Sequence, residues 1–178
     1  MKKIFLIILL CLIVPFNVYS FDIDITAKEA LLINLDNNKI YYEKNPSEKT
    51  YIASLTKIMT ALVAVENIDN LKDKVSIEED IINYYKNNQV MVSGYKSNTL
   101  YTYEDIIYGV LLASGADCSY ILEKNVKMVD KTFIDLMNDK AKELKMENTS
   151  FSNAIGLDDV NNYSTANDLA ILYKKALE

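Results

Sequence analysis

Ser54 and Lys57 are three positions apart, in the tetrapeptide Ser54-Leu55-Thr56-Lys57, where a run of apolar residues with helical spacing begins. Side chains at i and i+3 share one face of a helix, so the Lys57 amine can reach the Ser54 hydroxyl and accept its proton. The positive end of the helix would favour the resulting alkoxide. To act as a base, Lys57 needs a pKa lowered by burial or by a second cation. The spacing predicts a nucleophilic serine activated by a lysine.

Two other interpretations of such a tetrapeptide stay open at this point. Ser54 could be an ordinary N-cap followed by a solvated Lys57. The pattern also occurs a second time, from Ser93 to Lys96, in a segment that reads as a turn with no apolar helix after it. We interpret this second copy as a coincidence, because short motifs recur by chance.

The composition of the 178-residue chain excludes several kinds of chemistry. The chain has no His, and all 19 of its basic residues are Lys. Serine–histidine and cysteine–histidine catalysis are therefore excluded, as are His-ligated metals and bidentate guanidinium clamps. A net charge of −6, with acidic and basic residues mixed throughout, argues against nucleic acid as a partner. We expect no metal and no cofactor.

Residues 1–20 have the pattern of a secretory signal peptide. Lys2 and Lys3 precede an apolar run over residues 4–16, which is too short to span a bilayer, and the small residue Ser20 suits cleavage. The protein is thus expected to be exported and to act outside the cytoplasm, in the cell envelope or secreted. The mature part, residues 21–178, keeps one cysteine, Cys118, which we interpret as a small buried residue rather than a reactive thiol.

The apolar spacing predicts one β-hairpin followed by helices, an α+β domain. The hairpin joins residues 30–35 to residues 40–42, and a buried helix runs from Leu55 to Glu66, with a short helix possible over residues 77–85. Three further helices are expected after Thr-x-x-Asp starts, which are Thr102 with Asp105, Thr132 with Asp135, and Thr165 with Asp168. The last helix is expected to continue to Glu178 without a C-cap. One hairpin is marginal alone, so the sheet is expected to be incomplete at the C-terminus.

A wider set of ordered motifs resembles the D-alanyl-D-alanine carboxypeptidases, the low-molecular-mass penicillin-binding proteins. Residues 53–61 match the Ala-Ser-x-Thr-Lys-Ile-Met-Thr-Ala pattern of that family, after a similar hairpin. Ser114-Gly115-Ala116 resembles the family's Ser-x-Asn loop, and likeness continues through residues 133–141, 149–158 and 163–170. The resemblance implies a β-lactamase/transpeptidase-like α-β-α sandwich with an antiparallel sheet, of which residues 21–178 are the N-terminal part.

The resemblance also implies roles for individual residues. Ser54 would be the nucleophile acylated by a D-alanyl carbonyl, Lys57 its general base, and Ser114 a proton relay to the leaving amine. The backbone N–H of Ser54 would supply half of an oxyanion hole, and Gly115 and Ala116 would contact the substrate. The substrate would be a peptidoglycan pentapeptide ending in D-Ala-D-Ala, and β-lactams would acylate the same serine. Contact with the periphery of a membrane is left open.

Two departures from the family pattern keep alternatives open. Ala116 stands where the family has an Asn, and the family's Lys-[Thr/Ser]-Gly strand would follow Glu178. One alternative is a class A β-lactamase-like enzyme, although residues 153–159 lack the Glu that such an enzyme needs for deacylation. The other is a truncated, non-catalytic penicillin-binding module. We expect residues 21–178 alone to show little or no carboxypeptidase activity.

Overall fold

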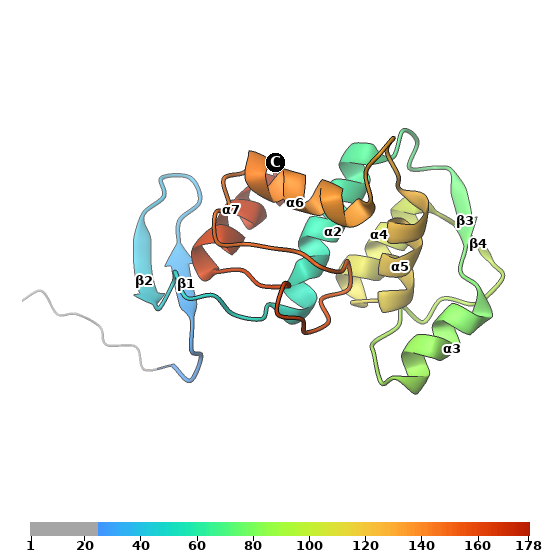
Figure 1. The fold of residues 1–178 in the computed structure, drawn as a ribbon, viewed down its shortest axis with the longest axis horizontal. Coiled ribbons are helices and arrows are strands. Elements are labelled where there is room, and N and C mark those ends of the chain that lie inside the picture. Colours follow the sequence, from blue (N-terminus) through green and yellow to red (C-terminus); the bar gives the residue numbers. More distant parts are fainter. Residues whose placement is uncertain (1–24) are drawn as a thin grey trace, which may run out of the picture.

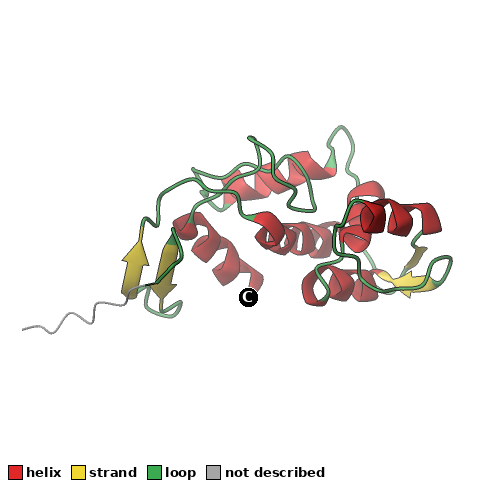
Figure 2. Ribbon diagram, turned by 90° about the horizontal axis from the view of Figure 1, so that it is seen from below, coloured by secondary structure: helices red, strands yellow, loops and turns green. Residues whose placement is uncertain are grey.

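The computed structural model describes residues 25–178, so the predicted signal peptide lies outside the described residues. A β-hairpin lies at one end of the molecule, a body of helices in the middle, and a second small sheet at the other end (Figure 1). Figure 2 shows the same order, with the strands on either side of the helices. The elements, in chain order, are β1 (Ala30–Ile33), β2 (Ile40–Lys44), the short 3₁₀ helix η1 (Ala53–Leu55), α2 (Thr56–Asn67), β3 (Lys74–Ser76), α3 (Glu79–Asn87), β4 (Leu100–Thr102), α4 (Tyr103–Leu112), α5 (Ala116–Asn125), α6 (Phe133–Glu143) and α7 (Ala166–Ala176).

The N-terminal hairpin forms as the sequence predicted. Strands β1 and β2 pair antiparallel, with Leu32 opposite Tyr42. The turn between them is held by Asn34, whose side-chain oxygen accepts hydrogen bonds from the N–H groups of Asp36 and Asn37. Helix α7 packs against β1, so the first and the last element of the described chain lie side by side (Figure 1).

The second sheet was not predicted. Strands β3 and β4 pair antiparallel, with Val75 opposite Tyr101. Each strand has only three residues, which is too short for an alternating apolar pattern to stand out. Helix α3, between these strands in the chain, occupies Glu79–Asn87 and so confirms the short helix expected over residues 77–85.

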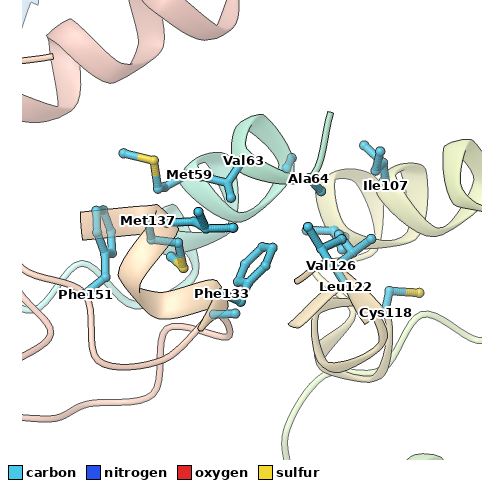
Figure 3. Close-up of a cluster of buried hydrophobic side chains, with 14 of the residues drawn as sticks. Met59, Val63, Ala64, Ile107, Cys118, Leu122, Val126, Phe133, Met137 and Phe151 are labelled. Atoms are coloured by element: carbon cyan, nitrogen blue, oxygen red, sulfur yellow. The ribbon is translucent and has the colours of Figure 1, made fainter. Parts of the chain in front are cut away.

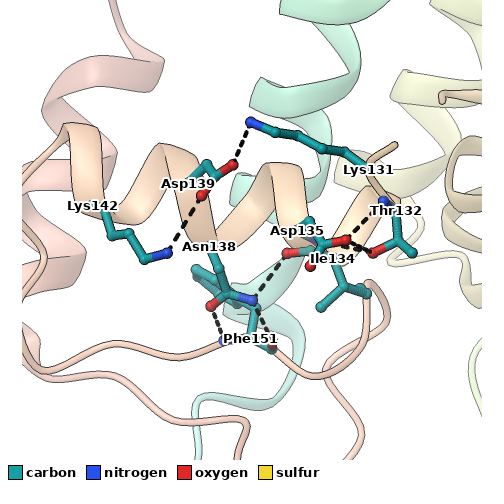
Figure 4. Close-up of polar contacts among 8 residues, drawn as sticks. All are labelled: Lys131, Thr132, Ile134, Asp135, Asn138, Asp139, Lys142 and Phe151. Atoms are coloured by element: carbon teal, nitrogen blue, oxygen red, sulfur yellow. Dashed lines mark hydrogen bonds and ion pairs between the residues drawn. The ribbon is translucent and has the colours of Figure 1, made fainter. Parts of the chain in front are cut away.

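The Thr-x-x-Asp starts are confirmed for all three helices. At α4 and α6 the Thr side chain accepts the Asp N–H and the Asp carboxylate accepts the Thr N–H, a complete capping box. Figure 4 shows the box of α6, made by Thr132 and Asp135. At α7 Thr165 caps Asp168, but the Asp168 carboxylate instead accepts hydrogen bonds from the Asn148 N–H and the Thr149 hydroxyl. The start of α7 is thereby tied to the loop that follows α6.

Helix α2 is the centre of the hydrophobic core. It contacts α4, α5, α6 and α7, and Met59 and Ala64 on it are completely buried. Figure 3 shows Phe133 and Met137 of α6 and Leu122 of α5 pointing toward this helix. Burying each side chain of this size stabilises the folded protein by about 1.5–3 kcal/mol. The core therefore holds α2, and with it the residues of its first turn, in a fixed position.

One predicted helix end was wrong, and one helix was not predicted. The final helix ends at Ala176, with Leu177 as its C-cap, and does not continue to Glu178. Helix α5 was not expected, because Gly115 precedes it where a Ser, Thr, Asn or Asp cap would have marked a start. Among residues 25–178, no helix is long and apolar enough to cross a membrane.

Candidate active site

Ser54 lies in η1, one turn before the regular part of α2. The expectation that Ser54 could serve as the N-cap is wrong, since Leu55 holds that position and makes no side-chain capping bond. The backbone is already helical at Leu55, whereas an N-cap residue needs an extended conformation. Ser54 itself is exposed, and its hydroxyl is therefore available to the side chains of Lys57 and Ser114.

Lys57 lies on the first turn of α2 and points into the protein. It is only 4% exposed, and its Nζ lies 3.4 Å from Ser54 Oγ. The same Nζ donates a hydrogen bond to the Ile155 carbonyl over 2.6 Å. Burial lowers the pKa of Lys57 to about 8. A substantial fraction of this amine is therefore neutral near pH 8, as a general base requires.

Ser114 reaches the pair from the loop between α4 and α5. Its Oγ donates a hydrogen bond to Ser54 Oγ over 2.9 Å, although the two serines are sixty positions apart. The backbone of Ser114 has a positive φ of 56°, which is uncommon for a residue other than glycine and is often found at functional sites. The structure thus brings together the three residues predicted to be catalytic, namely Ser54, Lys57 and Ser114.

The two residues predicted to contact substrate are buried behind Ser114. Ala116 has no exposed surface and packs near Tyr85 and Ile155. The N–H of Gly115 binds the Gly109 carbonyl, and the N–H of Ala116 binds the Met91 carbonyl. Direct substrate contact by Gly115 and Ala116 stays a prediction, and their burial gives it no support.

The second Ser-x-x-Lys copy, residues 93–96, lies on a loop, as predicted, and its Ser93 binds a buried carboxylate. The Ser93 hydroxyl donates a hydrogen bond to Asp117 Oδ2 over 2.6 Å, and the Ser93 N–H binds Asp117 Oδ1 over 2.8 Å. Asp117 is completely buried, so these two bonds satisfy a carboxylate that water does not reach. Gly115 allows this approach, since a Cβ there would lie 2.9 Å from Ser93 Cβ.

Two of the interaction partners described above, Asp117 and the Ile155 carbonyl, were not found from the sequence. Asp117 directly follows the Ser114-Gly115-Ala116 loop, but its contact with Ser93 depends on two segments that the fold brings together. The Ile155 carbonyl is a backbone group, and every residue type carries one. No sequence signal could have identified it as the partner of Lys57.

Cys118 is a buried packing residue, as predicted. It has no exposed surface, and burial raises the pKa of its thiol to about 12. A Cβ on Gly109 would lie 2.5 Å from Cys118 Sγ, so the thiol fills the space that this glycine leaves. A thiol that stays protonated is a poor nucleophile.

An apolar groove of about 610 Å³ lies next to Ser54. It runs between β1, the segment that leads into η1, and α7. Ala53 and Leu55, which flank Ser54, are among the residues that line it. Within residues 25–178, no cluster of metal-ligating side chains is found. The chemistry open to this arrangement is acyl transfer to Ser54 with Lys57 as the base.

Comparison with known proteins agrees with this chemistry. The family model described as Peptidase_S11, D-alanyl-D-alanine carboxypeptidase, matches residues 17–178. The D-alanyl-D-alanine carboxypeptidase DacF of Bacillus subtilis is 36% identical over 156 residues, which cover 85% of this chain and 39% of DacF. The D-alanyl-D-alanine carboxypeptidase DacC of Escherichia coli is 34% identical over 158 residues, which cover 84% of this chain and 39% of DacC.

The solved structures that resemble the chain are of the same kind. The Streptomyces K15 DD-transpeptidase superposes with a TM-score of 0.83 at 28% identity, covering 89% of this chain and 63% of that protein. Penicillin binding protein 5 of Haemophilus influenzae superposes with a TM-score of 0.78 at 29% identity, covering 89% of this chain and 47% of that protein. These likenesses confirm the expected α+β fold class. The chain spans about two fifths of the length of the curated relatives it matches.

Proposed function

Because the chain belongs to the D-alanyl-D-alanine carboxypeptidase family, we propose that it provides the acylating site of a serine-type D-Ala-D-Ala carboxypeptidase. The observation that carries the proposal is the position of Ser54 Oγ, 2.9 Å from Ser114 Oγ and 3.4 Å from the buried Lys57 Nζ. The protein would remove the terminal D-Ala of peptidoglycan stem peptides through an acyl-enzyme on Ser54.

In the first half of the reaction, neutral Lys57 accepts the proton of the Ser54 hydroxyl. The Ser54 oxygen attacks the carbonyl carbon of the penultimate D-Ala, and the N–H of Ser54 donates to the developing oxyanion. General-base assistance of this kind contributes about 10²- to 10⁴-fold in rate. The burial that lowers the pKa of Lys57 to about 8 is what makes the neutral amine available.

In the second half, the proton held by Lys57 must reach the nitrogen of the departing D-Ala. Ser114 can carry it, because its hydroxyl is already hydrogen-bonded to Ser54 and can both donate and accept. Water then attacks the acyl-enzyme, and Lys57 again takes the proton. The products are the shortened stem peptide and free Ser54.

Substrate, inhibitors and location follow from the same proposal. The substrate is a peptidoglycan pentapeptide ending in D-Ala-D-Ala, and β-lactams acylate Ser54 as covalent inhibitors. A cell-wall substrate requires a protein outside the cytoplasm, which agrees with the signal peptide expected over residues 1–20. Residues 21–178 then form the N-terminal part of the catalytic domain.

The apolar groove beside Ser54 fits a further part of the domain. Within residues 25–178, β1 pairs only with β2, and the groove exposes apolar side chains of β1 and α7. We propose that strands following residue 178 in the whole gene product cover this groove and bring a Lys-[Thr/Ser]-Gly segment to Ser54. The tests below therefore use the whole gene product that contains residues 1–178.

Acylation by benzylpenicillin, followed by intact-mass spectrometry, tests the proposal. We expect one covalent penicilloyl adduct, located at Ser54 by peptide mapping and absent from Ser54→Ala, together with release of D-Ala from a peptide ending in D-Ala-D-Ala. Fast turnover of a chromogenic β-lactam would indicate a β-lactamase instead. An adduct without D-Ala release would indicate a non-catalytic penicillin-binding module, and the absence of any adduct would overturn the proposed function.

A further inference from the structure

A single side chain, that of Asn153, organises the turn formed by residues 153–157. Its Oδ1 accepts three backbone N–H groups, from Ile155 at 3.2 Å, Gly156 at 2.7 Å and Leu157 at 3.0 Å. Its Nδ2 donates to the Leu157 carbonyl over 3.0 Å. These four bonds fix the directions of the peptide groups in the turn, which we call the Asn153 turn.

The Asn153 turn meets the reactive pair at two points. The Ile155 carbonyl accepts the hydrogen bond from Lys57 Nζ over 2.6 Å. Gly156, with a φ of 86°, lies so close to the carbonyl of Ala53 that an added Cβ would be 1.9 Å from that oxygen. The turn therefore touches the base directly and the nucleophile through the residue before it.

The contact with Ile155 decides how the Lys57 amine is oriented. A neutral amine has two N–H donors and one lone pair. When one N–H binds the Ile155 carbonyl, the rotation of Nζ is restricted, and the lone pair can be held toward Ser54 Oγ. A buried amine without this acceptor would have no fixed orientation, and misplacement of a base by about 1 Å can cost about 10² in rate.

We propose that Asn153 is a positioning residue for acylation, which acts by holding the Ile155 carbonyl against Lys57 and Gly156 against the backbone before Ser54. The proposal rests on the proposed function of Ser54 and Lys57 as nucleophile and base. Asn153 itself touches neither reacting atom. It acts through the turn, whose shape depends on its carbonyl oxygen.

Other groups attach the same turn to the helices. The Thr60 hydroxyl of α2 donates to the Ala154 carbonyl over 2.7 Å. Glu123 of α5 faces the turn, where burial raises the pKa of its carboxyl and a hydrogen bond with the Ala154 backbone opposes that rise. These anchors hold the turn on α2 and α5, whereas Asn153 sets the direction of the Ile155 and Gly156 peptides.

The test compares Asn153→Ala, Asn153→Asp and a control, Asn138→Ala. Asn153→Asp keeps an oxygen that can accept the three N–H bonds. Asn138 binds both the N–H and the carbonyl of Phe151, two residues before the turn (Figure 4), so its loss weakens the same segment without reaching Ile155. Two quantities are measured: the pKa of Lys57 by NMR of labelled lysine, and the rate of Ser54 acylation by benzylpenicillin as a function of pH.

For Asn153→Ala we expect acylation to fall by about 10- to 100-fold and the pKa of Lys57 to rise by about one unit toward its ordinary value, as water reaches the amine. Asn153→Asp should stay within about threefold of the unmodified protein, because the acceptor is retained. Asn138→Ala should lower the melting temperature and leave both quantities unchanged.

The proposal is overturned if Asn153→Ala keeps the pKa and pH profile of the unmodified protein, or if Asn138→Ala shifts them equally. Should Asn153→Ala fail to fold, Asn153→Gln, which moves the same amide by one methylene, gives the same comparison. Failure of the unmodified protein to be acylated would contradict the proposed function alone. In that case the NMR titration still decides whether Asn153 controls Lys57.

Discussion

The Ser114 hydroxyl donates a hydrogen bond to the Ser54 hydroxyl over 2.9 Å. Ser54 Oγ also accepts a hydrogen bond from Lys57 Nζ, 3.4 Å away, so the amine must lose a proton before the Ser54 hydroxyl can donate to it. Once Lys57 is neutral, the contacts allow proton transfer from Ser54 to Lys57 while Ser114 still donates to Ser54, as the proposed acylation requires. In the reverse direction, Ser114 can return the proton to a leaving amine.

Acylation of Ser54 should increase with pH. Burial lowers the pKa of Lys57 to about 8, and only the deprotonated amine can accept the serine proton. The acylation rate at low benzylpenicillin concentration should therefore rise as pH increases and reach half its maximum near pH 8. Lys57→Arg, which stays protonated, should lose this rise and react about 10²- to 10⁴-fold more slowly. A rate independent of pH between about 6 and 10 would contradict the role of Lys57.

Two variants that lack the Ser114 hydroxyl should have the same acylation rate but different stabilities. Both Ser114→Ala and Ser114→Gly lose the proton relay and should slow acylation by about 10²-fold. The positive φ at Ser114 strains any residue that has a Cβ, so the glycine variant should be more stable than the alanine variant by about 1 kcal/mol. Denaturant unfolding and penicillin labelling measure the two effects. Equal stability of the variants, or retained acylation, would argue against this assignment.

Substitution of Gly156 should damage the site much more than substitution of Gly94. Both glycines have a positive φ, of 86° and 83°. A Cβ on Gly94 meets open space, whereas a Cβ on Gly156 collides with the Ala53 carbonyl. Gly94→Ala should cost about 1 kcal/mol and leave acylation unchanged, while Gly156→Ala should cost about 3 kcal/mol or more and slow acylation. Thermal unfolding and labelling rates should show this contrast, and similar behaviour of the two variants would exclude a special role for Gly156.

Ser93 should be needed for stability and not for acylation. Its hydroxyl is one of two donors to the buried Asp117, and hydrogen bonds to charged groups contribute about 1.5–3 kcal/mol. Ser93→Ala should therefore lower the free energy of unfolding by about that amount and still form the penicilloyl adduct, unlike Ser54→Ala. Loss of the adduct in a folded Ser93→Ala protein would show that the second Ser-x-x-Lys copy takes part in the chemistry.

Much of the local structure followed from the sequence because its causes are local. The Thr-x-x-Asp starts at Thr102 and Thr132 form complete capping boxes, since donor and acceptor are only three residues apart. The hairpin over residues 30–44 has strand-forming residues on both sides of a polar turn. By contrast, β3 and β4 pair across more than twenty residues and are too short to have a pattern of their own.

In the candidate site, too, some features have local causes and others depend on contacts between distant residues. The proposed nucleophile and base were predicted from local spacing, because Ser54 and Lys57 fit one helical face and a chain without His leaves few other bases. The burial of Lys57, the contact between Ser114 and Ser54 and the hydrogen bond from the amine to Ile155 became visible in the folded structure alone. A lowered pKa comes from the removal of water by the surrounding core, and a hydrogen bond between distant residues comes from the packing of helices and loops. Neither cause is local in the sequence.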